Sequence, residues 1–445
     1  MTDRKQDDSQ AGQPQSPQPL STRRRSLVQA IAAGSAATFF GPWKVNHAWA
    51  QAAQKKPLTI GLTMDASGQY GASGVEERLG ATMAIRECND KGGVLGRTVE
   101  ALHMDTETTP ATGSRIAERM ITRNECAFLV GAMHSGVANA ISQVAQKYGC
   151  IFLNTNSSSP TESGKDCHRV KFVWDGNGTN YAHAIVKNAI RVSGKNWVLL
   201  TNDYVWGHST SKATRALVEA NGGKVLDEML VPQNTRDFSA YLIKLQQIKP
   251  QVVAAAVGGD DIKALRKQVV QLKLDKSFAW INNQQDWPDV YGLGPEEIFG
   301  VFGTNWYYRL DLPGVKEFVE KYQKVYPGVQ IKVPGNVYYN GYMATRELLR
   351  AVERAGSTNN IKVIKELESL KVSAKDRMQH HDAYMNAATH QMQQTIYMAT
   401  YNDQPVEKDD LFKILAQVPP NEVEDKDAPG ACKLESYEAT PTYEM

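Results

Sequence analysis

The sequence predicts an α/β protein built on two doubly wound parallel sheets. Short apolar, β-branched segments alternate with longer segments of helical period, starting with the strand Leu58–Leu62 and the helix 76–90. This alternation is typical of a parallel sheet covered by helices on both faces. Because the same pattern starts again after Lys171–Val173, we expect a second sheet of the same kind. The 445 residues, 42% of them hydrophobic, are enough for two globular domains.

Apolar runs, amphipathic periods and glycine stops predict the individual elements. In the first half, strands and helices are expected in alternation at 98–105, 111–123, 127–132, 137–148 and 150–154. In the second half, helices are expected at 181–193 and 208–223. Strands are expected at 196–203, 224–232, 251–259, 277–282 and 298–308. Glycine is common just past a helix C-terminus, and the pair Gly222-Gly223 ends the helix that begins at 208. Residues 314–370 are expected to be mostly helical and 394–403 to be a late strand.

Residues 21–51 predict an export signal. Three arginines, Arg23 to Arg25, precede a modest apolar stretch, and Ala48-Trp49-Ala50 is a small-x-small cleavage pattern. Residues 1–50 are therefore expected to be a signal peptide of the twin-arginine type, cleaved near Ala50, that sends the chain to the periplasm. The alternative is a membrane anchor, for which this apolar stretch is short and interrupted.

Charge and cysteine content exclude two kinds of site and leave a pairing open. The formal net charge of +2 gives no electrostatic footprint for nucleic acid. The five cysteines fit no zinc-binding spacing. Cys150 begins a strand and Cys167 lies in the loop region after it, so these two could form a disulfide in an oxidising compartment. The alternative is that all five are buried or free thiols.

Small polar residues follow the predicted strands, where an open parallel sheet binds its ligands. The stretch NTNSSSP, residues 154–160, follows the fourth strand. Comparable segments follow other strands at 64–74, 133–136, 202–209, 258–261 and 283–287. Their short side chains let backbone N–H groups approach a ligand, although any one loop could serve only as a turn or helix cap. Six such loops together predict a binding site assembled from many strand ends.

Residues 57–402 resemble solute-binding proteins of ABC importers of the leucine/isoleucine/valine-binding type. The resemblance lies in IGLTMDASGQYGASG, NDKGGVLGRTVEALHMDTETTPATG, VPQNTRDFSAYLIKLQQIKPQVVAAAVGG and YYNGYMATRELLRAVERAGS. It implies the type I periplasmic binding fold, with two lobes joined by hinge crossings near 173–174, 304–306 and 378–386. The boundaries that it implies are 57–173 plus 306–378 for lobe 1, 174–305 plus 379–417 for lobe 2, and an extended tail at 418–445.

The resemblance also implies a ligand in the cleft between the lobes. The positions that match the family's ligand contacts are Tyr70, Ser135, Asn156, Ser158, Tyr204, Trp206, Asp260, Gln284 and Gln285. Ser135 and Ser158 match hydroxyls that hold a ligand carboxylate. The family's acidic residue for an amino acid's ammonium falls in the region of Gln284 and Gln285, and a neutral amide pairs poorly with a buried ammonium. Asp260 or Asp286 would have to substitute for it.

The resemblance implies a receptor that captures an amino acid, an amide or a small or aromatic carboxylate. It would deliver this solute to permease subunits with a cytoplasmic ATPase, act as a monomer, and need no catalytic residue, cofactor or metal. An enzyme is one alternative, since His380, His381, Asp382 and His390 could form a metal or acid–base site, but their spacing fits no zinc-protease motif. A ligand sensor that signals to a partner is another, because fold alone does not separate transport from sensing.

Overall fold

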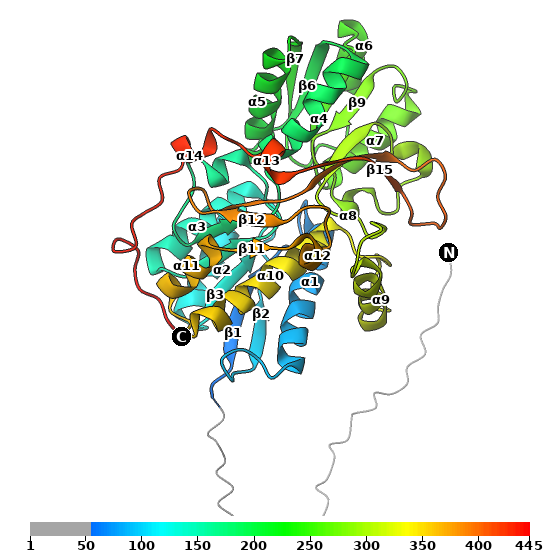
Figure 1. The fold of residues 1–445 in the computed structure, drawn as a ribbon. Helices are drawn as coiled ribbons and strands as arrows, with labels where there is room; N and C mark the ends of the chain where they lie inside the picture. Colours follow the sequence, from blue (N-terminus) through cyan, green and yellow to red (C-terminus); the bar gives the residue numbers. More distant parts are fainter. Residues whose placement is uncertain (1–54) are drawn as a thin grey trace, which may run out of the picture. The chain divides into compact units, whose positions relative to one another are not determined.

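The computed structural model describes residues 55–445, and these residues confirm the predicted α/β fold with two sheets (Figure 1). Each sheet consists mainly of parallel strands flanked by helices. The inner strands are apolar and buried along their whole length, as a sheet covered on both faces requires. The predicted signal peptide, residues 1–50, lies outside the described residues.

The first sheet has eight strands in the order β11-β12-β13-β5-β4-β3-β1-β2. Their bounds are β1 Leu58–Thr63, β2 Val99–His103, β3 Phe128–Gly131, β4 Ile151–Asn154, β5 Lys171–Val173, β11 Lys371–Val372, β12 Ala383–Asn386 and β13 Gln391–Gln393. The strands β1 to β5 and β13 run parallel, whereas β12 pairs antiparallel with both of its neighbours.

The second sheet has seven strands in the order β15-β14-β10-β9-β8-β6-β7. Their bounds are β6 Asn196–Asn202, β7 Lys224–Val231, β8 Val252–Ala256, β9 Ala279–Asn282, β10 Val301–Thr304, β14 Ile396–Tyr401 and β15 Phe412–Val418. The strands β6 to β10 are parallel, and β14 and β15 add an antiparallel edge.

Helices connect the strands and cover both sheets (Figure 1). Their bounds are α1 Gly71–Asp90, α2 Pro110–Thr122, α3 Ser135–Tyr148, α4 Gly178–Ser193, α5 Val205–Ala220, α6 Ser239–Ile248, α7 Asp260–Gln271, α8 Trp287–Val290, α9 Val315–Val325, α10 Asn336–Ala355, α11 Asn360–Glu368, α12 Ala374–Arg377, α13 Pro420–Val423 and α14 Ala428–Ala431. Short 3-10 helices occur at Pro160–Ser163 and Pro295–Glu297. Among residues 55–445, none of the helices is both long and apolar enough for a bilayer crossing.

The chain passes between the two sheets after β5, after β10 and after β13. The predicted third crossing at 378–386 is wrong, because β12 and β13 pair within the first sheet and the chain crosses only between Gln393 and Ile396. Residues 383–393 thus belong to lobe 1, although the family resemblance implied that 379–417 belong to lobe 2. These two strands have only three or four residues each and include polar positions, so apolar runs do not reveal them.

A buried polar network joins the three crossings. The Asp175 carboxylate, just after β5, accepts hydrogen bonds from Asn305 Nδ2 after β10 and from Tyr181 OH, each at 2.9 Å. Gln391 of β13 donates its side-chain amide to the Asp175 carbonyl. Gln394, on the third crossing, donates to the Trp174 carbonyl at 2.8 Å. The helix α4 then begins with a capping box, in which Asn177 accepts from two backbone N–H groups of the first turn.

The C-terminal tail packs on both lobes. After β15 it forms α13, where the Val423 carbonyl accepts a hydrogen bond of 2.7 Å from Asn180 of lobe 2. It then passes to lobe 1, where Asn360 at the start of α11 donates to the Tyr443 carbonyl at 2.9 Å. Figure 1 shows this red segment running from α13 and α14 to the C-terminus beside α11. The tail is therefore a fourth connection between the lobes.

A disulfide fastens this tail to lobe 1, and it is not the predicted one. Cys167 is bonded to Cys432, with 5.7 Å between the Cα atoms. The predicted pair Cys150–Cys167 is wrong because Cys150 is buried in the sheet, where its thiol faces the Ala127 carbonyl at 3.7 Å. Cys88, Cys126 and Cys150 are free thiols.

Candidate functional site

The candidate site is a small cavity between the two lobes. Its walls are formed by Tyr70, Met133, Asn156, Ser158, Tyr204, Trp206, Gly258, Gln284, Asp286 and Asp289. The first four belong to lobe 1 and the other six to the second-sheet segments after β6, β8 and β9. The cavity measures about 20 Å³, which is room for one water molecule. All of these residues follow the carboxyl ends of parallel strands, where the sequence analysis expected a site.

The cavity brings six of the nine predicted ligand contacts together. These six are Tyr70, Asn156, Ser158, Tyr204, Trp206 and Gln284. Ser135 lies directly behind the wall, where its Oγ accepts a 3.0 Å hydrogen bond from the backbone N–H of Trp206. Gln285 is also behind the wall, because its side-chain oxygen accepts from Arg266 at 2.7 Å. Asp260 pairs with Arg236 and Lys263 and does not line the cavity, so the structure does not bring it together with the other predicted contacts.

Hydrogen bonds across the cavity hold the lobes together. The hydroxyls of Tyr70 in lobe 1 and Tyr204 in lobe 2 are 2.6 Å apart. Ser158 Oγ of lobe 1 donates to Gln284 Oε1 of lobe 2. Beside the cavity, Gln69 Nε2 donates to the Gly258 carbonyl at 3.2 Å. The side chains that line the site are thus the same ones that connect the lobes.

Asn156 is fixed from behind by lobe 1. Its amide nitrogen donates to the Glu77 carboxylate at 3.1 Å, and its oxygen accepts from Asn340 of α10 at 3.0 Å. Thr155 donates to the same Glu77 oxygen. Two of the polar side chains in NTNSSSP therefore contact one buried carboxylate, which holds the loop in place and directs Ser158 toward lobe 2.

Buried carboxyl groups dominate the electrostatics of the site. Burial raises the pKa of the Asp289 carboxyl to about 7, and the neighbouring Asp286 carboxylate adds to this shift. Burial also raises the pKa of Asp286, against the effect of hydrogen bonds from Asn336 and Gln284. Asp175, behind Gln284, has its pKa raised well above the ordinary range by burial and by Asp286. Among residues 55–445, the cavity lining includes no Lys, Arg or His side chain.

Aromatic side chains form the remaining wall. The ring centroids of Tyr204 and Trp206 are 5.9 Å apart, and His134 stacks on Tyr204 with its centroid at 4.3 Å. Burial lowers the pKa of His134 to about 4, so this imidazole is neutral at pH 7. The Trp206 Nε1–H is buried and has no hydrogen-bond partner within residues 55–445.

The sequence did not predict Met133, Gly258 and Asp289 as wall residues. It indicated Asp286 only as a substitute for the acidic residue with which the family binds an ammonium group. Met133 and Gly258 lie in strand-end segments that the sequence did single out. Gly258 leaves space for the aromatic wall, because a Cβ there would be 2.9 Å from the Tyr70 hydroxyl oxygen. Asp289 had no sequence signal of its own, since its place depends on the short helix α8 turning back toward the cavity.

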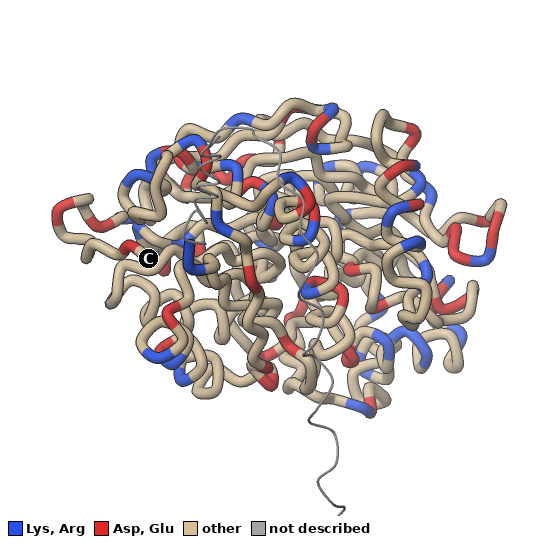
Figure 2. Tube along the Cα trace, turned by 90° about the horizontal axis from the view of Figure 1, so that it is seen from below, with Lys and Arg blue, Asp and Glu red and all other residues tan. Residues whose placement is uncertain are grey.

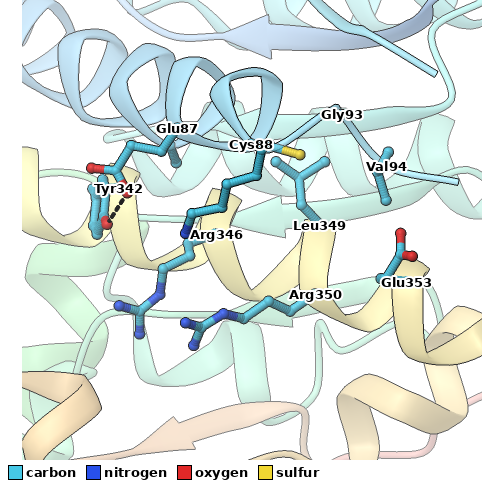
Figure 3. Close-up of a pocket in the computed structure, with 11 residues that line it drawn as sticks. Glu87, Cys88, Gly93, Val94, Tyr342, Arg346, Leu349, Arg350 and Glu353 are labelled. Atoms are coloured by element: carbon cyan, nitrogen blue, oxygen red, sulfur yellow. Dashed lines mark hydrogen bonds between the residues drawn. The ribbon is translucent and has the colours of Figure 1, made fainter. Parts of the chain in front are cut away.

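A larger cavity of about 370 Å³ lies elsewhere, between α1 and α10 of lobe 1 (Figure 3). Figure 3 shows the Arg346 and Arg350 guanidinium groups extending in the same direction and Tyr342 bonded to Glu87. Arg346 and Arg350 both pair with Glu347 at 2.8 Å, which compensates part of their charge. This cavity contains none of the predicted contacts and is lined from one lobe only. We therefore take the interlobe cavity as the candidate site.

The histidine-rich segment after α12 has structural contacts. His380 Nδ1 is 2.9 Å from Tyr397 OH, and Asp382 accepts from the Ala374 backbone at 2.7 Å. His390 is buried against Phe172 and bonds Glu368 at 2.9 Å. Within residues 55–445, no group of three or more His, Cys, Asp or Glu side chains is arranged to hold a metal ion. His380, Asp382 and His390 thus each bond to a neighbouring protein group.

Comparison with known proteins agrees with this architecture. Residues 57–405 match the family model described as periplasmic binding protein. A Leu/Ile/Val-binding protein of Rhizobium johnstonii is 24% identical over 313 residues, which cover 69% of this chain and 82% of that protein. A periplasmic binding protein from Burkholderia mallei superposes with a TM-score of 0.77 at 25% identity, covering 84% of this chain and 97% of that one.

A third relative was solved with a ligand. It is the solute-binding protein of an ABC transporter from Rhodopseudomonas palustris, in complex with 3,4-dihydroxybenzoic acid. The two chains are 19% identical, and their match covers 82% of this chain and 98% of the other with a TM-score of 0.74. At this identity the similarity shows a shared fold. With two α/β lobes, three crossings and a family match over most of its length, this chain belongs to the periplasmic binding protein family.

Proposed function

We propose that this protein is an extracytoplasmic receptor that captures a small solute between its lobes and delivers it to the permease of an ABC importer. The observation that carries the proposal is the cavity at the strand ends, whose walls come from both lobes and bond each other directly. A ligand in contact with both lobes stabilises the closed arrangement by its contacts to each. Export to the periplasm, with cleavage near Ala50 and a monomeric state, belongs to the same proposal.

Ligand entry requires the lobes to separate. A cavity of about 20 Å³ does not admit an amino acid or an aromatic acid. The Tyr70–Tyr204 and Ser158–Gln284 contacts must therefore exchange for contacts with the ligand, while the hinge network around Asp175 stays in place. The same hydroxyl and amide groups bond to each other without ligand and to the ligand when it is bound. The ligand therefore replaces hydrogen bonds between the lobes.

The family and the walls of the cavity together support a class of ligand. The relatives named above bind branched-chain amino acids or an aromatic carboxylate, and we infer a solute of comparable size here. Neutral donors on the wall are Ser158 and Gln284, and Asp286 supplies the acidic group that a ligand ammonium would need. Asp286, rather than Asp260, is the residue that supports amino-acid binding.

A thermal-shift screen of amino acids, amides, amines and aromatic carboxylates tests the proposal. A solute present at about 100 times its Kd adds roughly 2.7 kcal/mol to the free energy of unfolding, which raises the melting temperature visibly. We expect at least one class to do so, and we expect Gln284→Ala to weaken its binding. Binding that is unchanged in Gln284→Ala and in Ser158→Ala alike contradicts the assignment of the site.

A further inference from the structure

The lining of the interlobe cavity is acidic and includes no cationic side chain from residues 55–445. Asp286 and Asp289 line it, and the described part of the chain contributes no Lys, Arg or His to the lining. Behind Gln284 lies a third acidic group, the buried carboxyl of Asp175, to which the Gln284 amide donates at 2.8 Å. The nearest buried guanidinium, that of Arg266, is directed to Gln285 and to the carbonyls of Glu297 and Phe299. A carboxylate ligand would thus be placed against acidic groups.

Each lining carboxylate keeps one oxygen unused. Asp286 Oδ1 accepts from Asn336 at 2.8 Å and from Gln284 at 3.1 Å, and Asp289 Oδ2 accepts from the Gly259 N–H at 3.0 Å. Asp286 Oδ2 and Asp289 Oδ1 accept no hydrogen bond from residues 55–445. Both residues are more than nine-tenths buried, at 8% and 4% exposure, and both line the cavity. Two strong acceptors are therefore available to a ligand.

At two of the helix N-termini near the cavity, a protein side chain already accepts from a backbone N–H group. The helices α5 and α7 begin there, and an N-terminus attracts anions. In α7, however, the N-terminal Gly259 N–H already binds Asp289. In α5, the Trp206 N–H binds the Ser135 hydroxyl. Protein side chains thus occupy these two donors.

The aromatic wall completes a surface suited to a cation. Tyr70, Tyr204 and Trp206 face the cavity from both lobes. Cations bind the faces of such rings, and rings combined with carboxylates recognise ammonium groups. The Trp206 Nε1–H is buried and has no hydrogen-bond partner within residues 55–445.

We propose that the buried end of the ligand is an organic ammonium group, primary or methylated, that binds Asp286, Asp289 and the aromatic wall without needing a carboxylate. This inference rests on the proposed function, because it assigns the ligand class of the same cavity. It separates this chain from a receptor for aromatic carboxylates, and it places Asp289 among the residues that determine specificity.

Matched compounds test the charge directly in a thermal-shift and calorimetric titration of the purified protein. Choline and its uncharged isostere 3,3-dimethylbutan-1-ol differ in charge but hardly in shape. Benzylamine and benzoate, or isoamylamine and leucine, differ in the ionic group. We expect the ammonium member of each of the first two pairs to bind at least about tenfold more tightly, and isoamylamine to bind without the carboxylate of leucine.

Variants connect that preference to the named residues. Asp289→Asn and Asp286→Asn are expected to weaken ammonium binding by about tenfold or more, since each replaces a carboxyl group that can ionise beside an ammonium with a neutral amide. The matched control is Asp260→Asn, which removes a nearby charge that points away from the cavity and is expected to leave binding unchanged. Circular dichroism of each variant, together with its affinity for the uncharged isostere, separates loss of charge from loss of folding.

The outcomes separate this inference from the proposed function. Tighter binding of benzoate than of benzylamine, or binding of leucine but not isoamylamine, overturns the inference while a receptor function stands. Equal binding of choline and its isostere also overturns it. If no solute of any class raises the melting temperature, the proposed function fails together with the inference.

Discussion

Ser158 illustrates how one side chain of the NTNSSSP loop serves the site. Glu77 holds the loop through Thr155 and Asn156, and Ser158 is left to reach Gln284 in the other lobe. Its hydroxyl can therefore move from a protein partner to a ligand. The polar composition of the loop has two causes, since part of it anchors the backbone and part of it faces the cavity.

We predict that Ser158→Ala weakens ligand binding by ~1–3 kcal/mol, because a buried partner loses its hydrogen bond. Calorimetric titration with the solute found by screening measures this. Ser142→Ala is the control, since Ser142 is buried in α3 and bonds only the Asn139 carbonyl at 2.9 Å. An equal loss in both variants would show that the effect comes from the fold of lobe 1.

A second prediction at this scale concerns pH. The folded protein holds the pKa of Asp289 at about 7, above its ordinary value of 3.8, so between these values the folded chain binds a proton that the unfolded chain releases. The contribution of Asp289 to stability is thus present below about pH 4 and is lost as pH rises to about 7. Asp289→Asn has no carboxyl group to titrate and so avoids this loss. Between pH 4 and pH 8, we expect its free energy of unfolding to rise on the order of 2–4 kcal/mol relative to that of wild type.

Urea unfolding of wild type and Asp289→Asn at several pH values measures that difference. Asp260→Asn again serves as control, because its exposed carboxylate pairs with Arg236 and Lys263. A wild-type-minus-variant difference that does not change with pH contradicts the raised pKa of Asp289.

The elements show what could be predicted from the sequence and what could not. Long apolar runs such as 196–202 and 252–256 identified the parallel strands, because burial on both faces demands them. The strands β12 and β13 escaped detection because their few residues gain strand structure only from pairing with β5 and β11. In the site, strand-end loops indicated where the cavity lies and the family resemblance indicated six of its wall residues, whereas the place of Asp289 depends on the short helix α8.

The tail shows the same limit at longer range. Cys432 lies 265 residues after its partner Cys167, so sequence proximity favoured the wrong pair. The partner was decided by the path of the tail from β15 to α11, and tertiary packing sets that path. The tail passes so close to Gly149 that a Cβ at this position would be 1.9 Å from the Pro441 carbonyl oxygen.

We predict that Cys432→Ser lowers the free energy of unfolding by about 2–5 kcal/mol, because the disulfide restricts the unfolded chain and fastens the tail. Urea denaturation without reductant measures this. Cys88→Ser is the matched control, since Cys88 is a free thiol, and it should change stability little. If a reductant destabilises wild type and Cys432→Ser equally, the disulfide does not carry the effect.

At the scale of the whole molecule, the lobes are joined in two ways. The hinge network around Asp175 and the tail connect them permanently, whereas the contacts at the cavity can be exchanged for a ligand. Figure 2 shows that Lys and Arg positions are interspersed with Asp and Glu positions along the chain. Opening and closing about the hinge is therefore the motion that the architecture favours.

Tyr70→Phe tests this motion. It removes the hydroxyl contact with Tyr204, and we expect it to shift the lobes toward the open arrangement by about 1 kcal/mol. Small-angle scattering without ligand should then show a larger radius of gyration than for wild type. Tyr241→Phe, which loses a hydrogen bond within lobe 2, should not. An increase in both variants would indicate a general loosening.

A crystal structure of the protein with the solute that stabilises it would locate the binding site directly. We predict density between the lobes, in contact with Ser158 and Tyr70 on one side and with Trp206 and Asp286 on the other. A solute bound in the larger cavity between α1 and α10, or to one lobe alone with the Tyr70–Tyr204 contact unchanged, would contradict the account.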